Sequence, residues 1–257
     1  ARPKVLLATC YDEAIETYRR YETNIIGVIS DIGFVLHKGD PSSTEKLDAG
    51  IDLCRLIRKE NPTMPFLMQS SQEAMSSIAK QLKVGFVVKT SKTLTQELSA
   101  YIEREFGFGD FVAIDPRSGK EIARASDLEA FERVISTISS AAFRRLSDNN
   151  YLSKWLFARG LFAIGRHVQQ LQIQDDTDIE NIRLTNIRLI HDYRINQALG
   201  VVAKYSPQIY IDTIWFARCG DGAMGGKGRG LAFLNHTLQK HDLYDHWPQL
   251  RVLVPRT

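Results

Sequence analysis

The first hundred residues alternate between short apolar runs and longer segments in which apolar residues recur at helical spacing. The apolar runs lie at Val5–Ala8, Ile25–Ser30, Pro65–Gln69 and Phe86–Val88. Strand-length runs that alternate with helical segments predict strand–helix–strand units on a parallel sheet. We read these runs as four strands and expect a fifth in a short junction between elements.

The segments between these runs predict the helices of an α/β fold. They lie at Asp12–Tyr21, Gly50–Lys59, Ser71–Leu82 and Thr93–Phe106, and Asp12 is the expected N-cap of the first. A polar loop, His37–Asp48, precedes the second helix. Each predicted helix can therefore cover one face of the sheet between two strands.

The pattern changes after Gly107-Phe108-Gly109. Phe111–Ile114 and Glu121–Ala125 flank the turn Asp115–Gly119, and this arrangement predicts a β-hairpin. The chain becomes helical in pattern from Ser126-Asp127, which we expect to cap a helix. A mainly helical region should therefore follow the α/β part.

Three helices are expected in this region. The first carries Leu128, Phe131, Val134, Ile135 and Ile138 on one face; the second starts near Asn149 and carries Leu152, Trp155, Leu156 and Phe162; the third, Asp178–His191, buries Ile179, Ile182, Ile187 and Ile190. We assign the basic residues Arg144, Arg145, Arg183 and Arg188 to solvated helix faces. His167 and His191 lack neighbours at metal-ligand spacing, so we assign them to the surface or to packing.

The composition is that of an ordinary globular protein, with 257 residues, 44% hydrophobic, 25% charged and a net charge of +3. This small, dispersed charge argues only weakly for a nucleic-acid partner, and we expect none. Cys10, Cys54 and Cys219 lack the spacing of a zinc site or a disulfide framework, which favours a reducing compartment. No apolar run reaches the roughly 18 residues of a membrane helix. We therefore expect a cytoplasmic protein with no membrane partner.

Asp31, Ser70 and Lys89 each stand at the carboxyl end of a predicted strand. With the alternating pattern over about residues 3–106, they give a sequence that resembles a response-regulator receiver domain, which has a flavodoxin-like fold. The resemblance implies that Asp31 takes the place of the phosphoacceptor aspartate. Ser70 and Lys89 take the family's Ser/Thr and lysine positions.

The chain departs from this family at the metal site. Where the family carries an acidic pair, this chain has Thr9 and Cys10, and Thr90 replaces the proline after the lysine. Mg²⁺ needs hard oxygen ligands, and phosphoryl transfer to a carboxylate needs the cation to neutralise charge. We therefore favour a pseudo-receiver used for packing or docking, with Lys89 as the ion-pair partner of Asp31. A phosphorylatable switch is the alternative.

A glycine-rich segment, Gly225–Gly230, lies between a strand-like run, Ile209–Arg218, and a helix-like stretch. Backbone amides approach a phosphate closely where Cβ atoms are absent, and Lys227 adds a positive charge. We interpret the segment as half of a nucleotide site. Because a nucleotide-binding domain needs more chain than the residues up to Thr257, we expect the front part of a larger enzyme.

Other phosphate motifs fit this segment less well. A Walker A loop would require a glycine at Asp221 and a hydroxyl at Gly228. A dinucleotide fingerprint is present as Gly220–Gly225, but the strand-like run Arg251–Val254 does not end in an acidic residue. A glycine-rich turn that never meets a nucleotide also stays open.

A longer pattern resembles the start of the PEP/pyruvate-binding, ATP-grasp domain of PEP synthases and pyruvate phosphate dikinases. It is carried by Phe216–Arg218, Gly225–Lys227, Arg229–Leu234 and Val252–Pro255. In that family the Gly-Gly-Lys lysine contacts ATP phosphates, which implies this role for Lys227. The rest of the nucleotide-binding loop would be Gly225, Gly226, Gly228 and Arg229. Leu231, Leu234 and Leu238 lie at helical spacing and are expected to pack the helix behind the loop.

These observations predict a pseudo-receiver at 1–108, a mainly helical linker at 109–208 and the start of an ATP-grasp domain at 209–257. The resemblance implies ATP with Mg²⁺ as the cofactor of the whole protein and pyruvate or PEP as its substrate. This chain itself would hold no catalytic residue and no metal. Its partners would be the ATP-grasp and phosphohistidine domains of the same polypeptide, with a homodimer as a further option. The alternative is a non-catalytic two-component adaptor that docks a partner.

Overall fold

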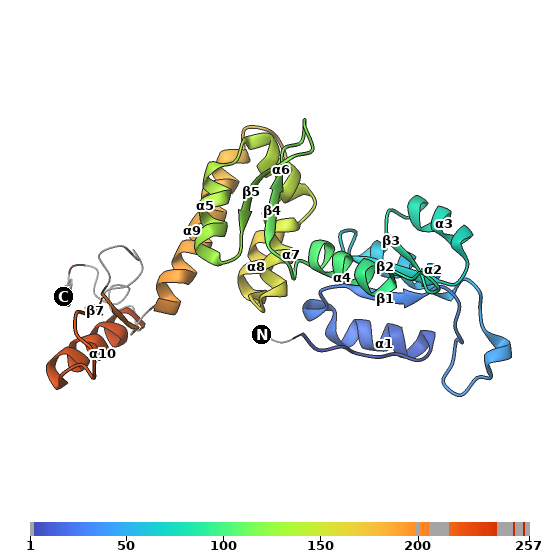
Figure 1. The fold of residues 1–257 in the computed structure, drawn as a ribbon, viewed down its shortest axis with the longest axis horizontal. Coiled ribbons are helices and arrows are strands. Elements are labelled where there is room, and N and C mark those ends of the chain that lie inside the picture. The colour runs from blue at the N-terminus through green and yellow to red at the C-terminus, as the bar shows by residue number, and fades with distance from the viewer. Residues whose placement is uncertain (1–2, 199–200, 206–215, 241–248, 250–253, 255–257) are drawn as a thin grey trace. The chain divides into compact units, whose positions relative to one another are not determined.

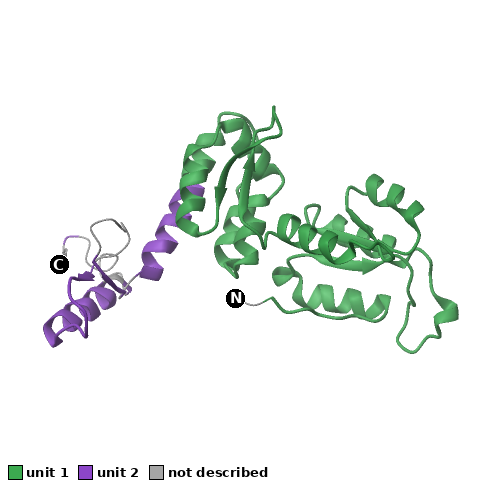
Figure 2. Ribbon diagram, in the orientation of Figure 1, with its two compact units in different colours: residues 1–184 green, residues 185–257 purple. Residues whose placement is uncertain are grey.

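The computed structural model describes residues 3–198, 201–205, 216–240, 249 and 254. The chain divides into two compact units, Ala1–Leu184 and Thr185–Thr257 (Figure 2). The first unit is a mixed α/β layer followed by a mainly helical region, as the hydrophobic pattern predicts. None of the described helices is both long enough and apolar enough to cross a membrane.

The α/β layer is built on a parallel sheet with the strand order β1-β2-β3 (Figure 1). Its strands are β1 (Val28–Asp31), β2 (Phe66–Ser70) and β3 (Gly85–Val88), and the connecting helices are α1 (Tyr11–Tyr21), α2 (Ala49–Glu60), α3 (Ser76–Gln81) and α4 (Leu94–Glu105). Short 3-10 turns occur at Glu22–Asn24, Ser42–Thr44 and Glu73–Met75. The register places Asp31 opposite Gln69 and Ser70 opposite Val88. Parallel pairing thus brings the carboxyl ends of all three strands to one edge.

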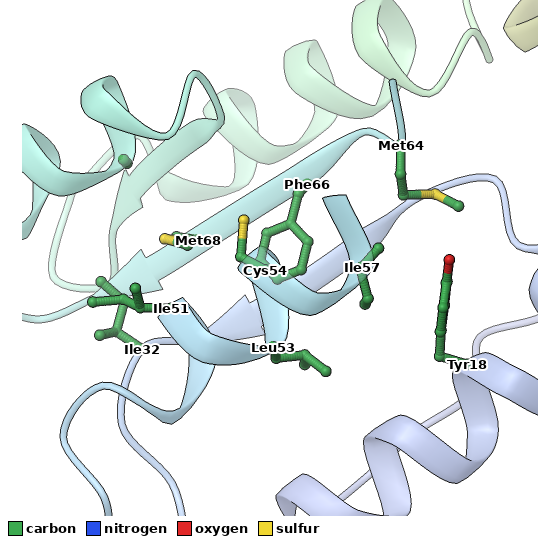
Figure 3. Packing of buried hydrophobic residues seen from close by; sticks show 10 residues of the cluster. Tyr18, Ile32, Ile51, Leu53, Cys54, Ile57, Met64, Phe66 and Met68 are labelled. Atoms are coloured by element: carbon green, nitrogen blue, oxygen red, sulfur yellow. The ribbon is translucent and has the colours of Figure 1, made fainter. Parts of the chain in front are cut away.

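The core of this layer lies around β2. Phe66, Leu67 and Met68 are fully buried because helices cover both faces of the central strand, as in other parallel sheets. Figure 3 shows Phe66 and Met68 packed against side chains of α2, with Tyr18 of α1 at the border of the same cluster. The continuous apolar run that predicted this strand therefore reflects burial on both sides.

The first predicted strand is wrong. Residues 3–8 form no strand, and Val5, Leu6 and Leu7 are 92%, 49% and 80% exposed. A strand exists only where a neighbour completes its hydrogen-bond ladder, and Val5–Ala8 pairs with no described strand. No fourth or fifth strand joins the sheet in the described part of the chain, so β1 is an outer strand.

The start of α1 also differs from the prediction. The N-cap is Cys10 instead of Asp12, and its side chain makes no capping bond. The Glu13 carboxylate instead accepts bonds of 2.8 Å from both the backbone N–H and the hydroxyl of Thr9. Glu13 thus ties the residue before the N-cap to the first turn of the helix, whereas in a capping box the same position bonds the N-cap amide.

The hairpin has the predicted bounds, with β4 (Phe111–Ile114) antiparallel to β5 (Glu121–Ala125). Gly119 closes the turn with a φ of +69°, a conformation that favours glycine. The strands bury Phe111, Ala113 and Ala125 on one face. The ring of Phe111 lies edge-on to Phe131 at 4.7 Å.

The helical region contains α5 (Leu128–Thr137), α6 (Ser140–Asp148), α7 (Tyr151–Ala158), α8 (Phe162–Gln170) and α9 (Ile179–Ala198). Asp127 caps α5 as predicted, accepting a bond of 2.8 Å from the amide of Ala130. The predicted second helix is in fact two, because the chain turns at Gly160 with a φ of +77°. Helix α6 was not predicted; Ser139 caps it by accepting a bond from the Ala142 amide.

The assignment of Arg183 to a solvated face is wrong. Its side chain is buried, and its guanidinium donates to the carbonyl oxygens of Ile135 and Ile138 at 3.0 and 2.6 Å. The last carbonyls of α5 lack partners within their own helix, and Arg183 supplies one. Arg145 and Arg188 are exposed, as predicted.

The second unit contains β6 (Val202–Lys204), parallel to β7 (Phe216–Arg218), and α10 (Gly226–Lys240). Its described core is small and centres on Phe216, Ala232 and Val254. The predicted helix is present, but it begins at Gly226, within the glycine-rich segment instead of after it. The prediction for Leu231 and Leu234 is wrong, because both are exposed, whereas Leu238 packs against the core. Most of the predicted strands Ile209–Arg218 and Arg251–Val254 lies outside the described residues.

Candidate functional site

The first candidate site is the polar edge at the carboxyl ends of the parallel strands, formed by Asp31, Ser70 and Lys89. The Lys89 ammonium donates to Asp31 Oδ2 at 2.6 Å, and the two side chains are 39% and 38% exposed. The predicted ion pair between them is therefore confirmed. Asp31 Oδ1 is buried and has no hydrogen-bond partner. The carboxylate is thus held by a single cation from one side.

Backbone bonds fix the position of this pair. The amide of Lys89 donates to the carbonyl of Ser70 at 2.9 Å, which continues the β2–β3 ladder beyond the strand end. The Ser70 hydroxyl does not reach Asp31; it accepts a bond of 3.1 Å from the amide of Gln72. Ser70 therefore shapes the loop after β2 instead of contacting the carboxylate.

Helix α2 begins directly against the end of β1. The amide of Gly50 donates to the carbonyl of Ile32 at 2.8 Å. A Cβ at position 50 would lie 2.0 Å from the carbonyl oxygen of Asp31, closer than any such contact allows. Glycine is therefore required for α2 to approach the Asp31 backbone.

Asp12 and Glu13, the acidic residues in the first turn of α1, are engaged away from Asp31. Glu13 accepts the two bonds from Thr9, and the Thr9 amide in particular lowers the pKa of Glu13. Asp12 lies 2.6 Å from Nδ1 of His37, and this contact raises the pKa of the imidazole. The described residues contain no group of three His, Cys, Asp or Glu side chains that could hold a metal ion. The edge therefore offers a neutralised carboxylate without the oxygen ligands of a magnesium site.

The second candidate site is the glycine-rich segment at the start of α10. Helix α10 begins at Gly226, and the amide of Arg229 donates to the carbonyl of Gly225 at 3.0 Å. The amides of residues 226–228 come before this first bond, so they have no acceptor within the helix. Lys227 and Arg229 are exposed in the first helical turn, so both positive charges are available at the helix start.

The glycines leave open space around this helix start. A Cβ at Gly225 or Gly226 would meet no atom within 4 Å, whereas one at Gly228 would lie 2.9 Å from Cγ of Met224. Steric crowding within the protein therefore does not explain the first two glycines. The sequence prediction gives another reason for these two glycines, which is that an external group approaches the backbone closely.

The loop before the helix is held by two basic residues that the sequence analysis did not assign. Arg218, at the end of β7, donates to the carbonyl oxygens of Gly220 and Gly222, and Gly222 has a φ of +101°. Lys204, at the end of β6, lies 2.6 Å from the carboxylate of Asp221. These contacts depend on the β6–β7 pairing, which no local motif in the sequence indicates.

Comparisons of the chain with protein-family models, with curated proteins and with solved structures find no match. The interpretation of both candidate sites therefore depends on their residues and geometry.

We expect Asp31 to remain unphosphorylated, because Thr9 and Cys10 supply no acidic ligand for the metal ion that phosphoryl transfer needs. The protein is incubated with acetyl phosphate and Mg²⁺, and its intact mass is measured. The expected result is no adduct. A stoichiometric phosphate adduct that disappears in Asp31→Asn would contradict this prediction.

Proposed function

We propose that this chain is the N-terminal regulatory and scaffolding part of an ATP-dependent phosphotransferase similar to PEP synthases and pyruvate phosphate dikinases. In this proposal the glycine-rich segment binds ATP phosphates in the whole enzyme, with Mg²⁺ as the accompanying cation. Pyruvate or PEP is then the substrate of domains beyond this chain. The chain itself supplies no catalytic residue.

The observation that carries the proposal is the position of Lys227. It stands in the first turn of a 15-residue helix that directly follows a loop from a β-strand. An anion placed there would meet unpaired amides, the positive end of the helix dipole and the Lys227 ammonium. The open space at Gly225 and Gly226 leaves room for a phosphate oxygen near the backbone. These features fit a phosphate-binding site at an exposed helix start in the second unit.

We infer that the α/β layer is a receiver-like, flavodoxin-like part that has lost its phosphotransfer role. Thr9 and Cys10 support this inference, because they take the place of the acidic pair that would hold the metal ion for phosphoryl transfer. Such a part would serve packing or docking. The loss of the phosphotransfer role also favours the second candidate function, a non-catalytic adaptor in which the glycine-rich segment binds no nucleotide.

Removal of the Lys227 ammonium should weaken ATP binding by about ten- to a hundredfold in the longer enzyme, since a hydrogen bond to a charged group contributes roughly 1.5 to 3 kcal/mol. ATP with Mg²⁺ is titrated calorimetrically into the parent enzyme and Lys227→Ala. Lys240→Ala is the matched control, because Lys240 is exposed at the opposite end of the same helix. Equal affinity in all three proteins would favour the adaptor.

A further inference from the structure

A tight backbone contact joins the loop after α4 to helix α7 within the first unit. Gly107 has a φ of +79°, and a Cβ there would lie 2.9 Å from the carbonyl oxygen of Lys154 and 3.0 Å from Cα of Trp155. The loop can approach α7 this closely because residue 107 has no side chain. We call this contact, formed by Phe106–Gly109 and α7, the α4–α7 joint.

Two side chains of the helical region fasten the joint. The Arg159 guanidinium donates to the carbonyl oxygens of Gly107 and Gly109 at 3.0 and 3.1 Å, and it lies 3.4 Å from the ring centroid of Trp155. Asn150 donates to the Thr63 hydroxyl at 2.9 Å. The α/β layer is therefore tied to the helical region by directed hydrogen bonds.

Lys154 places a half-buried ammonium in the same joint. Its Nζ lies 5.0 Å from the ring centroid of Tyr151, and it forms no hydrogen bond or ion pair with any described residue. The charged groups that face it are Glu105 of α4 and Arg58 of α2. Burial lowers the pKa of Lys154 to about 8, Arg58 adds to this effect, and Glu105 opposes it.

We propose that the α4–α7 joint is a charge-sensitive conformational device, which loosens when Lys154 carries a proton and tightens when Lys154 is neutral. In the closed joint the ammonium lies over the ring of Tyr151, with Glu105 of α4 among its charged neighbours, and no described carboxylate forms a hydrogen bond with it. Even partial burial of a cation without such a partner is costly, and the ring of Tyr151 compensates only in part. Opening of the joint returns the ammonium to water, so a proton on Lys154 favours the open form.

The direction of the pH response follows from the two pKa values. An exposed lysine has a pKa of 10.5, whereas Lys154 in the closed joint has a pKa of about 8. Between these values the closed form binds fewer protons than the open form, so its stability rises with pH. The free-energy cost of keeping the protonated Lys154 in the closed joint is fully present below about pH 8, and it is lost as the pH approaches 10.5. Near neutral pH a proton-free substitute should therefore tighten the joint.

Trp155 reports on the joint, because its ring is 2% exposed and lies under Arg159. In the test, the other tryptophans of the sequence, Trp215 and Trp247, are replaced by phenylalanine. Acrylamide quenching of Trp155 is then measured from about pH 7 to about pH 9.5, a range over which Lys154 loses its proton. The expected result is a fall of roughly twofold in the quenching constant as the pH rises.

In Lys154→Met, acrylamide should quench Trp155 weakly at every pH. Lys120→Met should show the same pH-dependent quenching as the parent, because Lys120 is exposed in the hairpin turn. Lys154→Gln serves as a second neutral variant, and circular dichroism confirms that each variant is folded. A pH response that persists in both Lys154 variants would overturn the proposal. A parent whose quenching is independent of pH would overturn it as well.

Discussion

Replacement of Trp155 by alanine is expected to lower the free energy of unfolding of the first unit by about 3 to 5 kcal/mol. The indole ring stacks on Phe131 with a centroid distance of 4.4 Å and lies edge-on to Phe111 at 6.1 Å. The Arg159 guanidinium also lies 3.4 Å from its ring centroid. Alanine would leave a cavity where the hairpin, α5 and α7 meet, and it would remove the surface on which Arg159 rests.

Urea denaturation followed by circular dichroism measures this loss. Trp155→Phe is the matched variant, because it keeps an aromatic ring against Phe131 and should cost clearly less than alanine. Leu184→Ala, at an exposed apolar position, should change stability by about 0.5 kcal/mol or less. A Trp155→Ala protein as stable as Leu184→Ala would show that this aromatic cluster does not hold the helical region together.

The elements that were predicted correctly are those whose signals are local. The hairpin is fixed by apolar alternation around a turn that ends at Gly119, so its strand bounds could be read directly. The central strand β2 stands out because burial on both faces demands a continuous apolar run. Asp127 marks the start of α5 because a carboxylate can accept the free amides of a first turn.

The wrong predictions concern properties that only tertiary contacts decide. Val5–Ala8 has strand-like residues, but no partner among the described strands completes its ladder. Gly160 divides one apolar segment into two helices because of a left-handed turn, which periodicity does not reveal. The sequence also does not show whether an arginine on a helix is solvated or buried, because that depends on whether a distant backbone carbonyl lacks a hydrogen-bond donor.

The candidate sites show the same limit. The Asp31–Lys89 pair was predictable, because parallel strands bring their carboxyl ends to one edge of the sheet. The Lys204–Asp221 pair was not, since it depends on pairing between β6 and β7. The sequence alone could predict a helix next to the glycine-rich segment, but not that the helix begins within the segment, at Gly226. The hydrogen bonds from Arg218 to the loop before this segment could not be predicted, because they depend on the three-dimensional fold.

Arg183→Met is expected to lower the free energy of unfolding of the first unit by about 3 kcal/mol, because it leaves the carbonyls of Ile135 and Ile138 without their donor. The arginine is 5% exposed and lies 4.9 Å from the ring centroid of Phe143, so methionine can replace the packing of its stem but not its hydrogen bonds. The Glu180 carboxylate, 3.1 Å from Nε, is mostly exposed and can be solvated once the arginine is lost. The cost should therefore come from the buried carbonyls.

Arg188→Met is the matched control, because Arg188 lies on the same helix and is exposed. These variants are made in the background in which Trp215 and Trp247 are phenylalanine, so that urea unfolding followed through Trp155 fluorescence reports the first unit alone. This separation matters because the chain has two units and need not unfold in one step. We expect Arg188→Met to change stability by about 0.5 kcal/mol or less and Arg183→Lys to fall between the two methionine variants, because one ammonium cannot reproduce the guanidinium fork. Equal stability of the two methionine variants would mean that the end of α5 finds other partners. The burial of Arg183 would then reflect packing alone, and its charge would contribute nothing that methionine lacks.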